Sequence, residues 1–107
     1  CLRGVIGAPP YRHLYKSTRW QPDIMMIQAL KEITSIPVIY DPSHATGKRS
    51  FVEGISLAAI VNGADGLIIE SHPYPQKSIS DPDQAISFEE FRKIVSLSHK
   101  ARNLINS

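Results

Sequence analysis

One histidine and two carboxylates are placed where a folded chain could bring them together. His44 follows a short apolar run by four residues, Glu70 directly follows a second run, and Asp81 lies in the polar segment after it. Such a set suits a divalent metal such as Mn, Fe, Co or Zn, without choosing among them. His72 is a competing ligand if the second run continues as a strand. Each residue also has a purely structural explanation, as a turn or capping residue.

Alternating helices and strands must position these residues. The apolar runs 37–40 and 66–69 predict strands that are buried on both faces. Helices are expected from about 22 to 33 and from 51 to 61, and residues 5–22 are expected to form a long loop. This order, loop–α–β–α–β–α, predicts an α/β fold with a parallel sheet. Because sites in such folds lie beyond the carboxyl ends of strands, we expect the segments after both runs to meet at one edge.

A third helix is expected to open at Ser87, where Glu90 three residues on completes a capping box. The positions expected to form its apolar side are Phe88, Phe91, Val95, Ala101, Leu104 and Ile105.

Two arginines, Arg3 and Arg19, flank the first loop, and arginines at such places indicate an anionic substrate. Ordinary surface charge is the favoured explanation of other basic residues.

Composition excludes several classes of protein. The chain has 107 residues, 42% of them hydrophobic and 21% charged, which is typical of globular proteins. A net charge of +2 without a basic cluster predicts no nucleic-acid partner. The apolar runs are too short for a membrane span, and a single cysteine fits a reducing, cytoplasmic compartment.

Several segments, in order, resemble the motifs of one enzyme family, the 3-deoxy-D-arabino-heptulosonate 7-phosphate (DAHP) synthases. The most specific is DPSHATG at 41–47, which resembles that family's signature. The others are CLRG at 1–4, TR at 18–19, GADGLIIESHP at 63–73, SISD at 78–81 and SFEEF at 87–91. The closest subgroup is the compact type that is also similar to 3-deoxy-D-manno-octulosonate 8-phosphate (KDO8P) synthase. That sister enzyme usually carries DATHS in place of DPSHATG, so the DAHP synthase interpretation is preferred.

The resemblance implies a (β/α)8 barrel, a divalent metal and the condensation of phosphoenolpyruvate with erythrose 4-phosphate. It makes His44, Glu70 and Asp81 metal ligands. The family's fourth ligand is a cysteine in a G-P-C-S motif, which this sequence does not contain. A homo-oligomer, dimeric or tetrameric, is also implied.

The same resemblance assigns the remaining site residues. Asp41 would lie beside the metal near the aldehyde substrate and act with His44 in catalysis. Arg3 would bind phosphoenolpyruvate, and Arg19 and Ser43 would contact substrate. Trp20 stands where asparagine is usual in the family.

The length of the chain disagrees with a complete barrel, which needs about 250 residues. We therefore expect residues 1–107 to be the C-terminal part of a single barrel domain and to be inactive alone. Two alternatives are a synthase that condenses arabinose 5-phosphate, and a barrel remnant that has lost catalysis.

Overall fold

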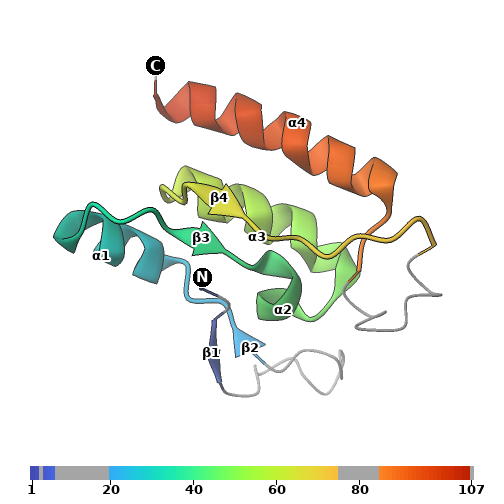
Figure 1. Ribbon diagram of the computed structural model, residues 1–107, viewed down its shortest axis with the longest axis horizontal. Coiled ribbons are helices and arrows are strands. Elements are labelled where there is room, and N and C mark those ends of the chain that lie inside the picture. The colour runs from blue at the N-terminus through green and yellow to red at the C-terminus, as the bar shows by residue number, and fades with distance from the viewer. Residues whose placement is uncertain (3, 7–19, 75–84, 107) are drawn as a thin grey trace.

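The computed structural model describes residues 1–2, 4–6, 20–74 and 85–106. Two strands, β3 and β4, lie side by side, with helices packed around them (Figure 1). The elements in chain order are β1 (Val5–Ile6), β2 (Trp20–Gln21), α1 (Met25–Ile33), β3 (Ile39–Tyr40), α2 (Pro42–Thr46), α3 (Arg49–Val61), β4 (Gly66–Leu67) and α4 (Phe88–Ile105). The expected α/β alternation is confirmed for these residues, although both strands are shorter than predicted.

The parallel pairing of the two predicted strands is confirmed. Ile39 lies opposite Gly66 and Tyr40 opposite Leu67. On the other edge of β3, Leu2 forms a parallel bridge with Tyr40, and its N–H donates to the carbonyl of Ile39 at 2.8 Å. Three chain segments therefore run in the same direction side by side, as consecutive units of a parallel α/β sheet do.

The first predicted loop is wrong at its two ends. β1 and β2 pair in antiparallel fashion, with Val5 opposite Gln21 and Ile6 opposite Trp20. The residues that they enclose, 7–19, lie outside the described residues. α1 also begins at Met25, three residues later than Pro22, and has no side-chain cap at its start.

The main core lies between the β3–β4 pair and the helices α1 and α3. It is formed by the buried residues Ile27, Val38, Tyr40, Ala45, Ala59 and Ala64. A smaller cluster of Val52, Ile86 and Ile94 joins α3 to α4, and the two helices run alongside each other in Figure 1. Burial of this apolar surface supplies the main stabilising term of the arrangement.

The start of α4 is as predicted, but most of its predicted apolar side is exposed. Ser87 and Glu90 form the expected capping box. Ile94 is the buried residue of this helix. The large residues expected to be covered are exposed: Phe88, Phe91, Val95, Leu104 and Ile105. The pattern correctly indicated an amphipathic helix, but the described part of the chain covers only a narrow strip of it.

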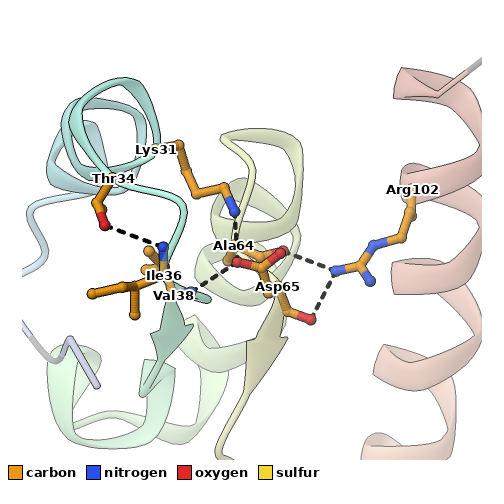
Figure 2. A network of polar contacts seen from close by, with 7 residues as sticks. All are labelled: Lys31, Thr34, Ile36, Val38, Ala64, Asp65 and Arg102. Carbon is orange, nitrogen blue, oxygen red and sulfur yellow. Dashed lines mark hydrogen bonds and ion pairs between the residues drawn. The ribbon is translucent and has the colours of Figure 1, made fainter.

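A network of polar contacts ties the elements together at the N-terminal ends of β3 and β4 (Figure 2). Asp65 Oδ2 accepts hydrogen bonds from Lys31 Nζ and from the backbone N–H of Val38, both at 2.8 Å. Arg102 Nη2 donates to the carbonyls of Ala64 at 2.8 Å and of Asp65 at 3.1 Å. The network thus joins α1, β3 and α4 to the turn before β4, at the end of the sheet opposite the candidate site.

These contacts also affect the protonation of Asp65. The hydrogen bond from Lys31, and then that from Val38, hold the pKa of this carboxyl below its ordinary value.

No helix in the described part of the chain has the length and apolar character that crossing a bilayer requires.

Candidate active site

The segment 41–47 follows β3 directly and contains a short helix, α2, where the sequence predicted a polar turn. The Asp41 side chain caps it by accepting from the backbone N–H of His44 at 2.9 Å, and Pro42 occupies its first position. Gly47 ends it with a positive φ of 62°, and its N–H donates to the carbonyl of Ser43 at 3.0 Å. Cap, proline and glycine together fix the side chains of this segment against the end of the sheet.

Asp41 holds the ring of His44 as well as the helix. Its Oδ2 lies 2.7 Å from His44 Nδ1, while its Oδ1 takes the backbone N–H of the same residue. Asp41 is 2% exposed, and the side chain of His44 is 32% exposed. An ionised Asp41 accepts a hydrogen bond from Nδ1–H, so the lone pair of the neutral ring is on Nε2. A carboxylate behind a histidine in this way is the usual support of a metal-binding imidazole.

The two strand ends meet, as the sequence predicted. The backbone N–H of Glu70, just past β4, donates to Ser43 Oγ at 2.9 Å, and Ser43 adjoins His44 in the chain. His44 and Glu70 therefore come from neighbouring turns at one edge of the sheet. A neutral imidazole and a carboxylate are ligands that fit Mn, Fe, Co or Zn. The described side chains thus fit part of a metal site, and the ligand roles themselves stay predictions.

Three of the expected site residues cannot be placed. Arg3, Arg19 and Asp81 lie outside the described residues. Within the described ranges, no group of three or more His, Cys, Asp or Glu side chains is arranged to hold a metal ion. His44 and Glu70 are the members of the expected ligand set that the structure describes.

His72, the competing ligand, is engaged differently. Its Nδ1 accepts a hydrogen bond from the backbone N–H of Tyr74 at 2.9 Å. A backbone N–H can only donate, so the proton of the neutral His72 ring is on Nε2. The geometry at His72 therefore leaves no ring lone pair for a metal, and His44 is the better candidate.

Ser43 has a bond that the sequence did not predict. The residue is 1% exposed, and its hydroxyl contacts the backbone of Glu70 across the strand ends. Its expected contact with substrate stays a prediction. The sequence shows that Ser43 adjoins His44. It does not show that the Ser43 hydroxyl accepts the backbone N–H of Glu70.

A comparison with known protein families finds a match over most of the chain. A model of the DAHP synthetase I family matches residues 7–107. A phospho-2-dehydro-3-deoxyheptonate aldolase of Thermotoga maritima is 39% identical over 95 residues, which cover 89% of this chain and 26% of that protein. A 2-dehydro-3-deoxyphosphooctonate aldolase of Desulfotalea psychrophila is 35% identical over 77 residues, which cover 62% of this chain and 28% of that protein.

Solved structures show the same similarity in three dimensions. A crystal structure of the Thermotoga maritima DAHP synthase matches with a TM-score of 0.84 and 36% identity, over 98% of this chain and 29% of that one. A truncated form of the same enzyme matches with a TM-score of 0.87 and 35% identity, covering 98% of this chain and 38% of that one. The chain thus spans between a quarter and two fifths of the length of these relatives. By its sequence and its fold, the chain belongs to the DAHP synthetase I family.

Proposed function

We propose that this chain is part of a metal-dependent synthase that condenses phosphoenolpyruvate with erythrose 4-phosphate to give DAHP and phosphate. The observation that carries the proposal is the Asp41–His44–Ser43–Glu70 arrangement at the carboxyl ends of two parallel strands. Family membership supports the reaction class, and the preference for DAHP follows the DPSHATG segment. In this proposal residues 1–107 contribute the C-terminal part of a (β/α)8 barrel.

In the proposed site, His44 and Glu70, with Asp81, hold a divalent metal. A metal held by these residues would polarise the aldehyde oxygen or activate a water molecule. Asp41 keeps the proton of His44 on Nδ1, so that Nε2 would be the ring atom that binds the metal. Arg3 and Arg19 bind the phosphate groups of the substrates, for which a planar guanidinium is well suited.

The condensation balances with water as its one further reagent, which supplies a hydroxyl to carbon 2 and a proton to the aldehyde oxygen. Carbon 3 of phosphoenolpyruvate forms a bond to the aldehyde carbon, whose oxygen takes up a proton. Water adds to carbon 2, and the bond to phosphate breaks, releasing inorganic phosphate. The partners proposed for the protein are thus two phosphorylated small molecules and, for assembly, further copies of itself.

One specific observation favours a second candidate. Curated octulosonate aldolases also match this chain, at 28% to 35% identity. In that reaction arabinose 5-phosphate replaces erythrose 4-phosphate. The chemistry at the metal is shared, so the two candidates differ in the aldose that the site accepts.

The test is a phosphate-release assay on the full-length protein. Purified protein is loaded with Mn²⁺ and supplied with phosphoenolpyruvate and either aldose. We expect turnover with erythrose 4-phosphate and little with arabinose 5-phosphate. The reverse preference would establish the second candidate, and no turnover with either would favour a barrel that has lost catalysis.

Two histidine variants complete this test. His44→Ala should lose both bound metal and turnover, because it removes a ligand. His99→Ala is the matched control, since this histidine is exposed on α4, away from the strand ends. If His44→Ala keeps the metal content of the wild type, the proposed ligand set is wrong.

A further inference from the structure

Next to the candidate site, the backbone N–H of Glu70 does not bond to a backbone carbonyl of the segment that continues β3. Ile68 N–H donates to the carbonyl of Tyr40 at 2.9 Å. The next N–H on the same side of this segment is that of Glu70, two residues on. In a continued parallel ladder it would donate to the carbonyl two residues after Tyr40, that of Pro42. Pro42, however, begins α2, and its carbonyl accepts from Thr46 Oγ1 at 2.8 Å.

The hydroxyl of Ser43 takes the place of the missing acceptor. Its Oγ accepts the Glu70 N–H at 2.9 Å, and the residue is 1% exposed. An N–H that lacks an acceptor away from water costs about 1–3 kcal/mol. This part-buried bond therefore favours the position that the Glu70 backbone has in the structure. A hydroxyl on α2 thus extends the ladder by one bond beyond the end of β3.

Glu70 is fixed on its other side as well. Its carbonyl accepts from the N–H of Ile86 at 3.1 Å, and the N–H of His72 donates to the carbonyl of Ile86 at 2.9 Å. The backbone of Glu70 is therefore held between Ser43 and the segment that enters α4. Of these two supports, Ser43 is the one that belongs to the same short helix as His44.

We propose that Ser43 is a positioning residue for the metal site. Its hydroxyl sets the position of the Glu70 backbone relative to His44, so that imidazole and carboxylate reach one metal ion together. This inference rests on the proposed function, because it assumes that both residues are ligands. Asp41 and Ser43 then have parallel tasks: the first orients the ring of His44, and the second places Glu70.

The experiment compares two buried serines in the full-length protein. Ser43→Ala removes the hydroxyl that contacts Glu70. Ser56→Ala is the matched control, because Ser56 is fully buried in α3 and its hydroxyl donates to the carbonyl of Val52 at 2.6 Å. Each variant is stripped of metal and titrated with Mn²⁺ by calorimetry, and hydrogen–deuterium exchange is followed on peptides that contain Glu70.

We expect Ser43→Ala to weaken Mn²⁺ binding by about 10- to 100-fold, the usual effect of losing a group that supports a ligand. Its Glu70 amide should exchange faster than in the wild type, in the absence of metal. Ser56→Ala should leave both quantities at the wild-type values, although its unfolding temperature falls. A Ser43→Ala protein with wild-type affinity and wild-type exchange would overturn the proposal.

The His44→Ala variant separates this failure from failure of the proposed function. Loss of Mn²⁺ binding in His44→Ala together with normal binding in Ser43→Ala would remove only the positioning role. Normal binding in both variants would remove the ligand set and the positioning role with it. Equal weakening in Ser43→Ala and Ser56→Ala would show a general packing effect and also overturn the inference.

Discussion

The carboxylate of Asp41 contacts His44 twice, once at the backbone N–H at 2.9 Å and once at ring Nδ1 at 2.7 Å. A single buried side chain therefore caps α2 and selects the tautomer of the histidine on it. The two tasks use different oxygens, and each oxygen accepts a hydrogen bond from His44. Asparagine has one oxygen and one amide nitrogen, so an Asp41→Asn variant can keep the contact with the backbone N–H and lose the acceptor for Nδ1–H.

The first prediction is that Asp41→Asn weakens metal binding without unfolding α2. The amide oxygen still accepts the His44 N–H, but the amide nitrogen donates to Nδ1 and shifts the ring proton to Nε2. We expect Mn²⁺ affinity to fall by about 10- to 100-fold in calorimetric titrations. Asp65→Asn, at the opposite end of the sheet, serves as the control and should bind Mn²⁺ normally. Equal affinities of Asp41→Asn and wild type would show that the contact does not support a ligand.

The second prediction concerns the pH dependence of stability at Asp65. Its pKa is lowered in the folded protein, first by the Lys31 hydrogen bond, so its stabilising effect is complete above the unfolded value of 3.8. That effect is lost as the pH falls through the lower, folded value. Asp65→Asn should reduce the free energy of unfolding at neutral pH by about 1 kcal/mol or less, because the ion pair is partly exposed.

Urea unfolding at several pH values checks this prediction. The difference between wild type and Asp65→Asn should shrink as the pH is lowered below about 4, where the carboxyl takes up a proton. Glu89→Gln changes an exposed carboxyl in the first turn of α4 and should show only a small, helix-dipole effect. A wild-type advantage that grows on acidification would contradict the assigned sign.

The parallel pairing of β3 and β4 was predictable from the sequence, because strand–helix–strand units follow general rules. Two apolar runs with a helix between them predict parallel neighbours, and Ile39 does lie opposite Gly66. The meeting of the Ser43 and Glu70 turns follows from the same rule. The hydrogen bond between the Ser43 hydroxyl and the Glu70 backbone does not follow from this rule. It forms because the chain begins α2 at Pro42 instead of continuing β3.

Local signals left other features open. Asp41, Pro42 and Gly47 suit both a turn and a one-turn helix, and five residues are too few for helical periodicity to decide. On α4, periodicity shows which side is apolar but not what packs on it, so Phe91 and Leu104 lie on the predicted apolar side and are nevertheless exposed. Ile94, which no signal singled out, is the buried residue of that helix.

The third prediction is that one substitution has opposite effects at two glycines of the same region. Gly54 lies inside α3, and a Cβ there would meet nothing within 4 Å. Gly54→Ala should therefore stabilise by about 0.5–1 kcal/mol, through lower entropy of the unfolded chain. Gly63, after the end of α3, has a φ of 104°, and Gly63→Ala should destabilise by about 1–2 kcal/mol. Urea unfolding midpoints test this, and shifts of the same sign would refute it.

The fourth prediction couples two residues that face each other across β3 and β4. A Cβ added at Gly66 would lie 2.9 Å from Ile39 Cδ1, closer than real contacts allow. Gly66→Ala should destabilise by only about 0.5–1.5 kcal/mol, because the methyl at the far end of the Ile39 side chain can turn aside. Ile39→Val deletes the clashing methyl, so the double variant should be more stable than the sum of the single changes predicts. Simple additivity in a double-mutant cycle of urea midpoints would rule out this contact.

The fifth prediction concerns Tyr40, which is fully buried and whose hydroxyl has no hydrogen-bond partner among the described residues. Burial, then the charges of Asp23 and Asp41, raise the pKa of this phenol to about 12. The folded state therefore holds the proton more tightly than the unfolded state, and this stabilisation is present below pH 10 and lost towards pH 12.

Tyr40→Phe should match or exceed the wild type in unfolding midpoint near neutral pH, because it removes a buried polar group that makes no bond. Its advantage should grow between pH 10 and about pH 12, where the wild type loses the contribution of the protonated phenol. Tyr74→Phe is the matched control, since Tyr74 is 64% exposed and its removal should give no such trend. A loss of about 1 kcal/mol or more in Tyr40→Phe at neutral pH would mean that the hydroxyl forms a hydrogen bond after all.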